Sequence, residues 1–371
     1  MLQPPPAQPG MREDEVDTPA LLLDLDAFEH NLARMQSLLK PTGARLRAHA
    51  KTHKSPVIAH RQIASGAVGQ CVQKVGEAEV LAWGGVSDIL VSNQVVGEGK
   101  LARLAALARI SQIAVCADDA GNVGRIEAAA QAAGVRLPVL VEIDVGMTRC
   151  GVQPGPEAVA LASVIAGSKH LRFAGLQAYH GRAQHLRTPA ERERAIGGAV
   201  EGVRRTVEQL RQQGIGCDII GGAGTGTFEI EAASGLYNEI QAGSYCFMDA
   251  DYARNQDGAS AGFRHALFVL ATVMSQARPG LAVVDAGHKA VPIDSGMPLL
   301  WERDAIRYTG ASDEHGRLEW SSESAGPKLG EKLRLVPGHC DPTVDRFDWY
   351  VGVRDGRVEC LWPVAARGAL A

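Results

Sequence analysis

Residues 45–56 read RLRAHAKTHKSP, and this stretch carries the pattern from which the fold is predicted. A strand-like run at 45–50 ends in the polar residues 51–54, after which Ser55 and Pro56 are of the types preferred at a helix N-terminus. The same order of apolar run, polar end and Ala/Leu/Arg-rich stretch of helical period recurs along the chain. The other predicted strands are residues 68–72, 88–92, 112–116, 137–144, 171–179, 217–221 and 238–241, and the predicted helices are residues 56–64, 76–83, 101–108, 120–133, 156–166 and 189–213.

Eight strands that alternate with helices predict an α/β fold whose leading architecture is a TIM (β/α)8 barrel. An open, doubly wound sheet is the alternative that the same pattern allows. From residue 263 the chain becomes rich in Val and Leu, and Asp355-Gly356 separates two strand-like runs as a type I′ hairpin turn does. We therefore predict a flexible N-terminal extension at 1–17, a barrel at 18–262 and a C-terminal all-β domain at 263–371, while the run at 20–24 fits either domain.

The composition indicates a small-molecule task and argues against binding to nucleic acid or to a membrane. The 371 residues include 42 acidic and 38 basic side chains, so the chain offers no net positive field to an anionic polymer or lipid surface. Its seven cysteines are an odd number without a CxxC pair, which argues against a disulfide framework and favours a reducing cytoplasm. The opening MLQPPPAQPG lacks the apolar run of a signal peptide, and no apolar stretch is long enough to span a bilayer.

Two glycine-rich loops, which follow the seventh and eighth predicted strands, predict a phosphate site. Residues 221–227 read GGAGTGT, and residues 242–245 read AGSY. Glycines let backbone N–H groups approach a phosphate, Thr and Ser add hydroxyl donors, and TIM barrels commonly bind phosphate with the loops after strands seven and eight. A tight turn without a ligand is the alternative for GGAGTGT taken alone.

Three further strand ends carry candidate catalytic and binding groups. Lys51 ends the first strand, where partial desolvation would lower the pKa of its amine and make it a Schiff-base nucleophile; a basic loop that faces water is the alternative. Arg149, after the fifth strand, is suited to pair with a phosphate or a carboxylate. At the end of the sixth strand, Tyr179 is placed either to face a ring cofactor or to pack in the core, and His185 is a candidate proton acceptor.

The segment PGHCDPT, residues 337–343, predicts a divalent-metal site in the β domain. In an extended or looped segment, residues 339 and 341 point the same way, so His339 and Asp341 can converge on one cation. Two ligands leave positions open for water and substrate, and a carboxylate suits Mn, Mg, Co or Zn without a strong preference. HxD alone is a weak pattern, and Asp313, in the acidic turn at 312–316, is a less favoured additional ligand.

Six segments together resemble the D-threonine aldolase family and its relatives, the D-3-hydroxyaspartate aldolases and D-serine dehydratases. These segments are RAHAKTHKSP, EIDVGMTRCG, QAYHGRAQH, GGAGTGTF, QAGSY and PGHCDPT. The resemblance covers nearly the whole chain from about residue 18 and implies the alanine racemase-like fold type of pyridoxal-phosphate enzymes. It implies that Lys51 carries pyridoxal 5′-phosphate and that a divalent metal binds His339 and Asp341. The cofactor-binding residues that we carry over are Arg149, Tyr179, Thr225, Gly226, Gly243, Ser244 and the adjoining Tyr245.

The resemblance also implies a reaction, the cleavage of a D-β-hydroxy amino acid such as D-threonine or D-3-hydroxyaspartate to glycine and an aldehyde. A metal that coordinates the β-oxygen, with His185 or a water on the metal as base, would assist loss of the hydroxyl proton. Dehydratase relatives usually carry His-x-Cys, whereas this chain has His-Cys-Asp at 339–341, which resembles the aldolases. A dehydratase that releases ammonia and an oxo acid, and a non-catalytic protein that only binds the cofactor, are the alternatives. Relatives of this fold type also lead us to expect a homodimer.

Overall fold

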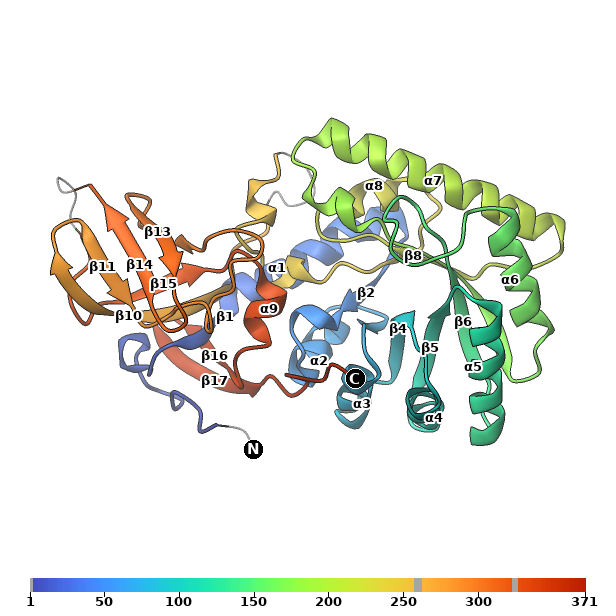
Figure 1. The fold of residues 1–371 in the computed structure, drawn as a ribbon, viewed down its shortest axis with the longest axis horizontal. Helices are drawn as coiled ribbons and strands as arrows, with labels where there is room; N and C mark the ends of the chain where they lie inside the picture. The colour runs from blue at the N-terminus through green and yellow to red at the C-terminus, as the bar shows by residue number, and fades with distance from the viewer. Residues whose placement is uncertain (1–2, 257–261, 322–325) are drawn as a thin grey trace.

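The computed structural model describes residues 3–256, 262–321 and 326–371, in which a closed barrel lies beside a β domain (Figure 1). Eight parallel strands close the barrel in chain order, which confirms the TIM architecture over the open sheet. Each predicted strand is found within two residues at either end. The barrel strands are β2 (Arg45–His49), β3 (Gly69–Val72), β4 (Asp88–Gln94), β5 (Gln112–Ala117), β6 (Leu137–Glu142), β7 (Leu171–Ala178), β8 (Ile219–Gly222) and β9 (Glu239–Ile240).

Helices alternate with these strands and cover the outside of the barrel (Figure 1). Two of the helices around the barrel were not predicted: α8 (Phe228–Ala233) follows β8, and α1 (Leu25–Leu39) precedes β2 and contacts α8. The start of α1 had a local signal, because the Asp24 carboxylate accepts a hydrogen bond from Ala27 N at 2.9 Å as an N-cap. The six predicted helices are α2 (Pro56–Ala64), α3 (Val75–Trp83), α4 (Glu98–Leu107), α5 (Ala120–Ala133), α6 (Pro156–Gly167) and α7 (Pro189–Gln212). Among the described residues, no helix combines the length and the apolar character needed to cross a membrane.

The β domain is built on one nine-stranded sheet with the order β13-β14-β11-β10-β1-β16-β17, in which β15 also pairs with β10 and β12 pairs with β15. Strand β1 (Ala20–Asp24) pairs antiparallel with β10 and parallel with β16, so it lies in this sheet although the predicted barrel range included it. The remaining elements are β10 (Leu267–Arg278), β11 (Leu281–Val284), β12 (Leu299–Leu300), β13 (Ile306–Ala311), β14 (Gly316–Trp320), β15 (Lys332–Val336), α9 (Cys340–Val344), β16 (Trp349–Arg354) and β17 (Arg357–Pro363).

Residues 3–17, the described part of the segment expected to be a flexible extension, instead pack against the β domain. Val16 is fully buried, Gly10 N donates to Val358 O at 2.8 Å, and Arg334 Nε donates to Glu13 Oε1 at 2.7 Å. These contacts hold the segment on the surface of the sheet; residues 1–2 lie outside the described residues. The turn between β16 and β17 has φ angles of 49° and 70° at its two central residues, as the predicted type I′ hairpin requires.

The barrel closes where β9 pairs with β2, and a buried charge network lies at this seam. Arg47 Nε donates to Glu239 Oε2 at 2.7 Å, and Arg47 Nη1 donates to Asp88 Oδ1 at 2.7 Å. Only 5% of Arg47 and 1% of Glu239 are exposed. Burial opposes the charged guanidinium, but the hydrogen bonds with Glu239 and Asp88 outweigh burial and raise the pKa of Arg47. Every charge at the seam therefore has a partner.

We expect Arg47→Met to lower the free energy of unfolding by about 3–5 kcal/mol, because it leaves the buried Glu239 carboxylate without its main partner. Arg45→Met is the matched control: Arg45 donates to the same carboxylate at 3.1 Å, but its side chain is 52% exposed. Because this arginine is half exposed and Arg47 still pairs with Glu239, loss of the Arg45 contact should cost less than about 1 kcal/mol. Urea denaturation measures both variants, and equal destabilisation would contradict the role assigned to burial.

Candidate active site

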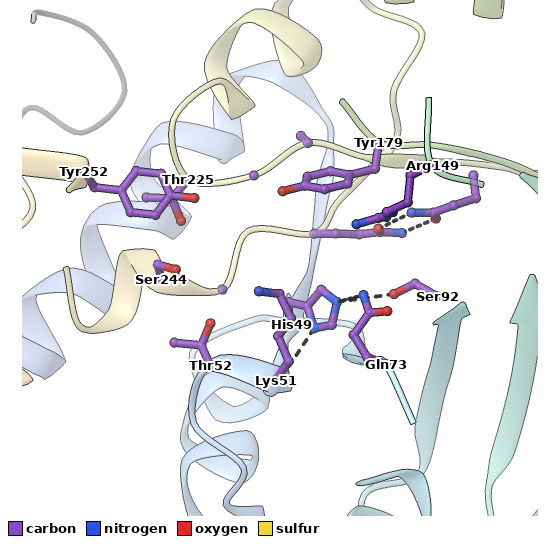
Figure 2. Close-up of a pocket in the computed structure, with 15 residues that line it drawn as sticks. His49, Lys51, Thr52, Gln73, Ser92, Arg149, Tyr179, Thr225, Ser244 and Tyr252 are labelled. Atoms are coloured by element: carbon purple, nitrogen blue, oxygen red, sulfur yellow. Dashed lines mark hydrogen bonds between the residues drawn. The ribbon is translucent and has the colours of Figure 1, made fainter. Parts of the chain in front are cut away.

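A cavity opens at the C-terminal ends of the barrel strands, where TIM barrels carry their chemistry (Figure 2). It holds about 580 Å³ of free space counted out to its open mouth. Six of the eleven predicted site residues line it, and the other five are not among its lining residues. The lining residues are His49, Lys51, Thr52, Gln73, Ser92, Arg149, Gln177, Tyr179, Ala223, Gly224, Thr225, Gln241, Gly243, Ser244 and Tyr252.

Lys51 lies in a short 3-10 turn (Ala50–Thr52) directly after β2, and its amine forms an ion pair with Asp341 of the β domain. Burial favours the neutral amine, but the charge and hydrogen bond of Asp341, together with the electrostatic effects of Tyr179 and Glu77, outweigh burial, so the pKa of Lys51 is raised. The expected lowering of this pKa is therefore wrong here, because it left out a carboxylate from the other domain. Burial likewise opposes ionisation of Asp341, but the charges of Lys51 and His339 and the hydrogen bond from Lys51 together bring the pKa of that carboxyl well below its usual range.

Several polar residues that line the cavity were missed by sequence reasoning. His49 Nε2 lies 2.9 Å from the amide nitrogen of Gln73 and 3.3 Å from Ser92 Oγ (Figure 2). Burial lowers the pKa of His49 to about 3, so the ring is neutral. Gln177 Nε2 donates to Gln241 Oε1 at 2.7 Å, and Gln241 Nε2 donates back to Gln177 Oε1 at 2.8 Å. No local motif marks Gln73, Ser92, Gln177 or Gln241, which lie within or just after barrel strands.

The glycine-rich loop after β8 brings an unpaired hydroxyl to the cavity. Thr225 Oγ1 is buried and has no hydrogen-bond partner among the described residues. Gly226 was predicted to bind the phosphate, but in this structure its N–H donates to Gln184 Oε1 at 2.9 Å. Gln184 also donates to Thr227 Oγ1 at 2.7 Å, so its carboxamide holds the loop at two points. A buried hydroxyl without a partner in such a loop fits a phosphate oxygen.

The loop after β9 brings Ser244 to the cavity and turns Tyr245 away from it. Gly243 precedes Ser244, and a Cβ at Gly243 would lie 2.8 Å from the backbone oxygen of His49, so a side chain there would push this loop from the end of β2. Tyr245 is only 1% exposed, and its ring centroid lies 5.9 Å from that of Phe263. Tyr245, which we expected near the cofactor, is therefore a core residue in this structure.

Tyr179 and Arg149 lie together across the cavity from Lys51 (Figure 2). The Arg149 guanidinium lies over the Tyr179 ring, 5.8 Å from its centroid, which is cation–π geometry. Burial raises the pKa of Tyr179, so the phenol keeps its proton. Arg149 is exposed at the mouth, where its planar guanidinium is suited to meet a carboxylate or phosphate.

His185 lies outside the set of lining residues, at the end of a 3-10 turn (Gly181–His185). Its Nδ1 is 2.5 Å from Asp251 Oδ2, and its ring packs on that of Tyr252, a lining residue, at 5.9 Å between centroids. Burial opposes ionisation of Asp251, but hydrogen bonds from His185 and Arg187 lower the pKa of Asp251 to about 2. A carboxylate on Nδ1 orients the imidazole and leaves Nε2 for proton transfer.

His339 and Asp341 lie together beside the cavity, with His339 Nε2 4.0 Å from Asp341 Oδ2. The two side chains come together as expected, but not because residues 339–341 are extended. His339 is the N-cap of α9, and Asp341 is in the first turn of that helix. The other ring nitrogen, His339 Nδ1, is 3.0 Å from Asp294 Oδ2. Within the described ranges, no bond links the Asp313 side chain to either residue, and no cluster of three or more His, Cys, Asp or Glu side chains suited to a metal is found.

The residues at the cavity fit pyridoxal phosphate and a divalent cation. Lys51 supplies an amine for covalent attachment, and the hydroxyls of Thr225 and Ser244 supply donors for a phosphate. For the cation, Asp341 Oδ1 is buried and has no partner in the described part of the chain. That oxygen and the imidazole of His339 form the N/O donor set that Mn, Zn and similar ions accept.

Glu231, in α8, is a buried carboxylate close to the Thr225 loop. It is 1% exposed, and its Oε1 accepts a hydrogen bond from Thr227 Oγ1 at 2.8 Å. Its Oε2 has no partner among the described residues. Burial raises the pKa of Glu231 to about 8. The neutral carboxyl avoids a negative charge next to a loop suited to an anion.

Comparison with known proteins identifies the family of the chain. Residues 23–251 match the alanine racemase N-terminal domain, and residues 266–353 match the putative serine dehydratase domain. The chain is 46% identical to the 3-hydroxy-D-aspartate aldolase of Paracoccus denitrificans (strain Pd 1222), over 98% of this chain and 95% of the relative. It is 47% identical to the D-threonine aldolase of Arthrobacter sp, over 98% of this chain and 96% of the relative.

Solved structures and more distant relatives extend this comparison. The crystal structure of D-threonine aldolase from Filomicrobium marinum matches with a TM-score of 0.97 and 51% identity, over 99% of this chain and 100% of that one. The D-threo-3-hydroxyaspartate dehydratase of Delftia sp. (strain HT23) is 32% identical, over 93% of this chain and 96% of the relative. The aldolases are therefore much more similar to this chain than that dehydratase, and the fold class and family resemblance expected from the sequence are confirmed.

The raised pKa of Glu231 predicts that the folded state loses stability as pH rises. Between the ordinary pKa of 4.5 and the folded value of about 8, the folded state keeps a proton that the unfolded state has lost. The free energy of unfolding should fall across this window by at most about 1.4 kcal/mol per pH unit. Glu231→Gln keeps the acceptor for Thr227 and should reduce this slope, whereas Glu193→Gln, at an exposed position of α7, should not. Thermal unfolding of the three proteins across the window measures the slopes, and equal slopes would contradict the prediction.

Proposed function

The chain belongs to the pyridoxal-phosphate-dependent family that contains D-threonine aldolase and 3-hydroxy-D-aspartate aldolase, and we propose that it is a metal-activated aldolase acting on D-β-hydroxy amino acids. The products are glycine and an aldehyde, from D-threonine, D-3-hydroxyaspartate or a substrate of the same class. The observation that carries the proposal is the contact between Lys51 of the barrel and Asp341 of the β domain. This contact brings an amine suited to the cofactor and a carboxylate suited to a metal to one cavity mouth.

One end of the cavity is suited to the phosphate of the cofactor, and the other end is suited to a carboxylate of the amino acid. Lys51 would carry pyridoxal phosphate, whose phosphate the hydroxyls of Thr225 and Ser244 would bind. When bound, this cofactor supplies an electron sink for the electron pair left on Cα as the Cα–Cβ bond breaks. In Figure 2, Thr225 and Ser244 lie at one end of the cavity and Arg149 at the other. Arg149 would therefore bind a carboxylate at the end away from the phosphate.

Cleavage also requires a base for the β-hydroxyl, and we assign this role to His185. Loss of the hydroxyl proton lets the oxygen form a carbonyl while the Cα–Cβ bond breaks, and Cα then takes up a proton to give glycine. The 2.5 Å contact of Nδ1 with Asp251 leaves the other ring nitrogen, Nε2, to accept the proton. Tyr252 lines the cavity and its ring packs against that of His185, so a substrate whose hydroxyl reaches past Tyr252 would meet the imidazole.

His339 and Asp341 would hold the divalent cation, whose role is to make the substrate hydroxyl more acidic. The charge distribution supports a cation at this place. An amine that binds the cofactor no longer serves Asp341 as its partner, and a buried carboxylate without a partner costs several kcal/mol. A cation shared by Asp341 and His339 offsets this cost, and Mn, Mg, Co and Zn all suit the two donors.

The proposal includes a cytoplasmic location and a homodimer. All seven cysteines are free thiols, which supports a location in the reducing cytoplasm. The expected homodimer rests on the fold type alone, and analytical ultracentrifugation measures it directly.

We expect the cofactor-loaded protein to convert D-threonine and D-3-hydroxyaspartate to glycine and an aldehyde in equal amounts. Quantifying glycine, aldehyde, ammonia and oxo acid from each substrate tests this, and ammonia with an oxo acid as the main products would indicate a dehydratase instead. Lys51→Ala is the control. It should abolish both the products and the visible absorbance of the covalently bound cofactor, because it removes the attaching amine.

Chelation should remove cleavage without removing the cofactor. Treatment with EDTA should lower the rate about 100-fold or more, because activation of the hydroxyl by a metal is worth several kcal/mol. Added Mn²⁺ should restore the rate of the wild type but not of His339→Ala, while the visible absorbance stays constant throughout. Full activity of the chelated protein would refute the metal requirement.

A further inference from the structure

His339 lies between two carboxylates, one at each nitrogen of its ring. Asp294, in the segment between β11 and β12, has Oδ2 3.0 Å from His339 Nδ1. On the other side of the ring, Asp341 Oδ2 is 4.0 Å from His339 Nε2. Of these two carboxylates, only Asp341 contacts Lys51, so the contact with Asp294 has no direct role in the proposed reaction.

We propose that Asp294 is a positioning residue that fixes His339 for metal binding; this inference rests on the proposed metal-dependent function. An ionised carboxylate only accepts hydrogen bonds, so it holds the imidazole proton on Nδ1. The lone pair that a metal requires is then on Nε2, the nitrogen next to Asp341. Histidines that bind metals commonly have such a partner on the second nitrogen, and its loss typically weakens metal affinity about 10–100-fold.

The segment that carries Asp294 is held tightly although the side chain itself is 52% exposed. Gly296 O lies so close to Gly338 that a Cβ at Gly338 would be 2.3 Å from it. Ser295 Oγ donates to Asp294 Oδ2 at 3.1 Å, and Arg254 Nη2 donates to Ser295 O at 2.6 Å. Packing and hydrogen bonds, in place of burial, thus set the position of the carboxylate.

Arg254 also connects this segment to the proposed base. The same Nη2 atom donates to Asp251 Oδ1 at 2.8 Å, and Asp251 is the partner of His185. The carboxylates that orient the two histidines are therefore supported by one arginine. This arrangement suits a site in which a base and a metal must act on the same hydroxyl.

The test is a titration of the cofactor-loaded enzyme with Mn²⁺ alone, in which electron paramagnetic resonance measures the free ion. We expect Asp294→Ala to bind Mn²⁺ about 10–100-fold more weakly than the wild type, and Asp294→Asn to lie between them because the amide keeps an acceptor oxygen. At saturating Mn²⁺ both variants should regain most of the wild-type kcat, since Asp294 does not line the cavity. Asp313→Asn, at an exposed carboxylate of the same domain, should bind Mn²⁺ as the wild type does.

The outcomes separate this inference from the function on which it rests. Equal Mn²⁺ affinity of the wild type and Asp294→Ala would overturn the role of Asp294 and leave the metal site in place. A wild type that binds no Mn²⁺ would contradict the metal site of the proposed function and overturn this inference with it. If Asp294→Ala fails to fold, the more conservative Asp294→Asn decides, and wild-type affinity in that variant counts against the proposal.

Discussion

The ion pair between Lys51 and Asp341 is the contact on which the site depends, because its two partners come from different domains. The loop after β2 makes this contact possible, since it is bonded to the β domain at neighbouring points. Tyr350 donates to His53 O at 2.7 Å, and Lys54 pairs with a carboxylate just after α9 at 2.9 Å. These buried bonds fix how the β domain sits on the barrel. A rotation of the β domain would therefore break them and separate the amine from the carboxylate.

Two histidines of the site, one in each domain, are each held by an aspartate at Nδ1. His185 is held at Nδ1 by Asp251, and His339 is held at Nδ1 by Asp294. In each case a loop position alone would leave the ring free to turn, and the carboxylate removes that freedom before any substrate binds. Arg254 bonds to both supporting segments, so the barrel and the β domain contribute to one hydrogen-bonded framework.

The fold was largely predictable because its signals are local. Alternation of apolar runs and helical periods marks βα units, and the runs after residue 263 mark the β domain. Lys51 and Thr225 could be selected because a strand end and a glycine-rich loop identify them. The electrostatics could not be predicted, since Lys51 and its partner are 290 positions apart and no local rule pairs them. Tyr245 shows the opposite error, because a residue adjacent to a binding loop turned out to pack in the core.

Strand β1 shows that the two domains do not simply follow one another along the chain. The chain enters the β domain first, then builds the whole barrel, and only afterwards supplies β10 and β16, the two neighbours of β1. The barrel is thus an insertion within the β domain, and no single cut separates the two. Recombination between relatives at the start of the β region, near residue 263, would pair a central strand from one parent with neighbours from the other. Exchange of intact domains therefore needs two crossovers, one on each side of the barrel.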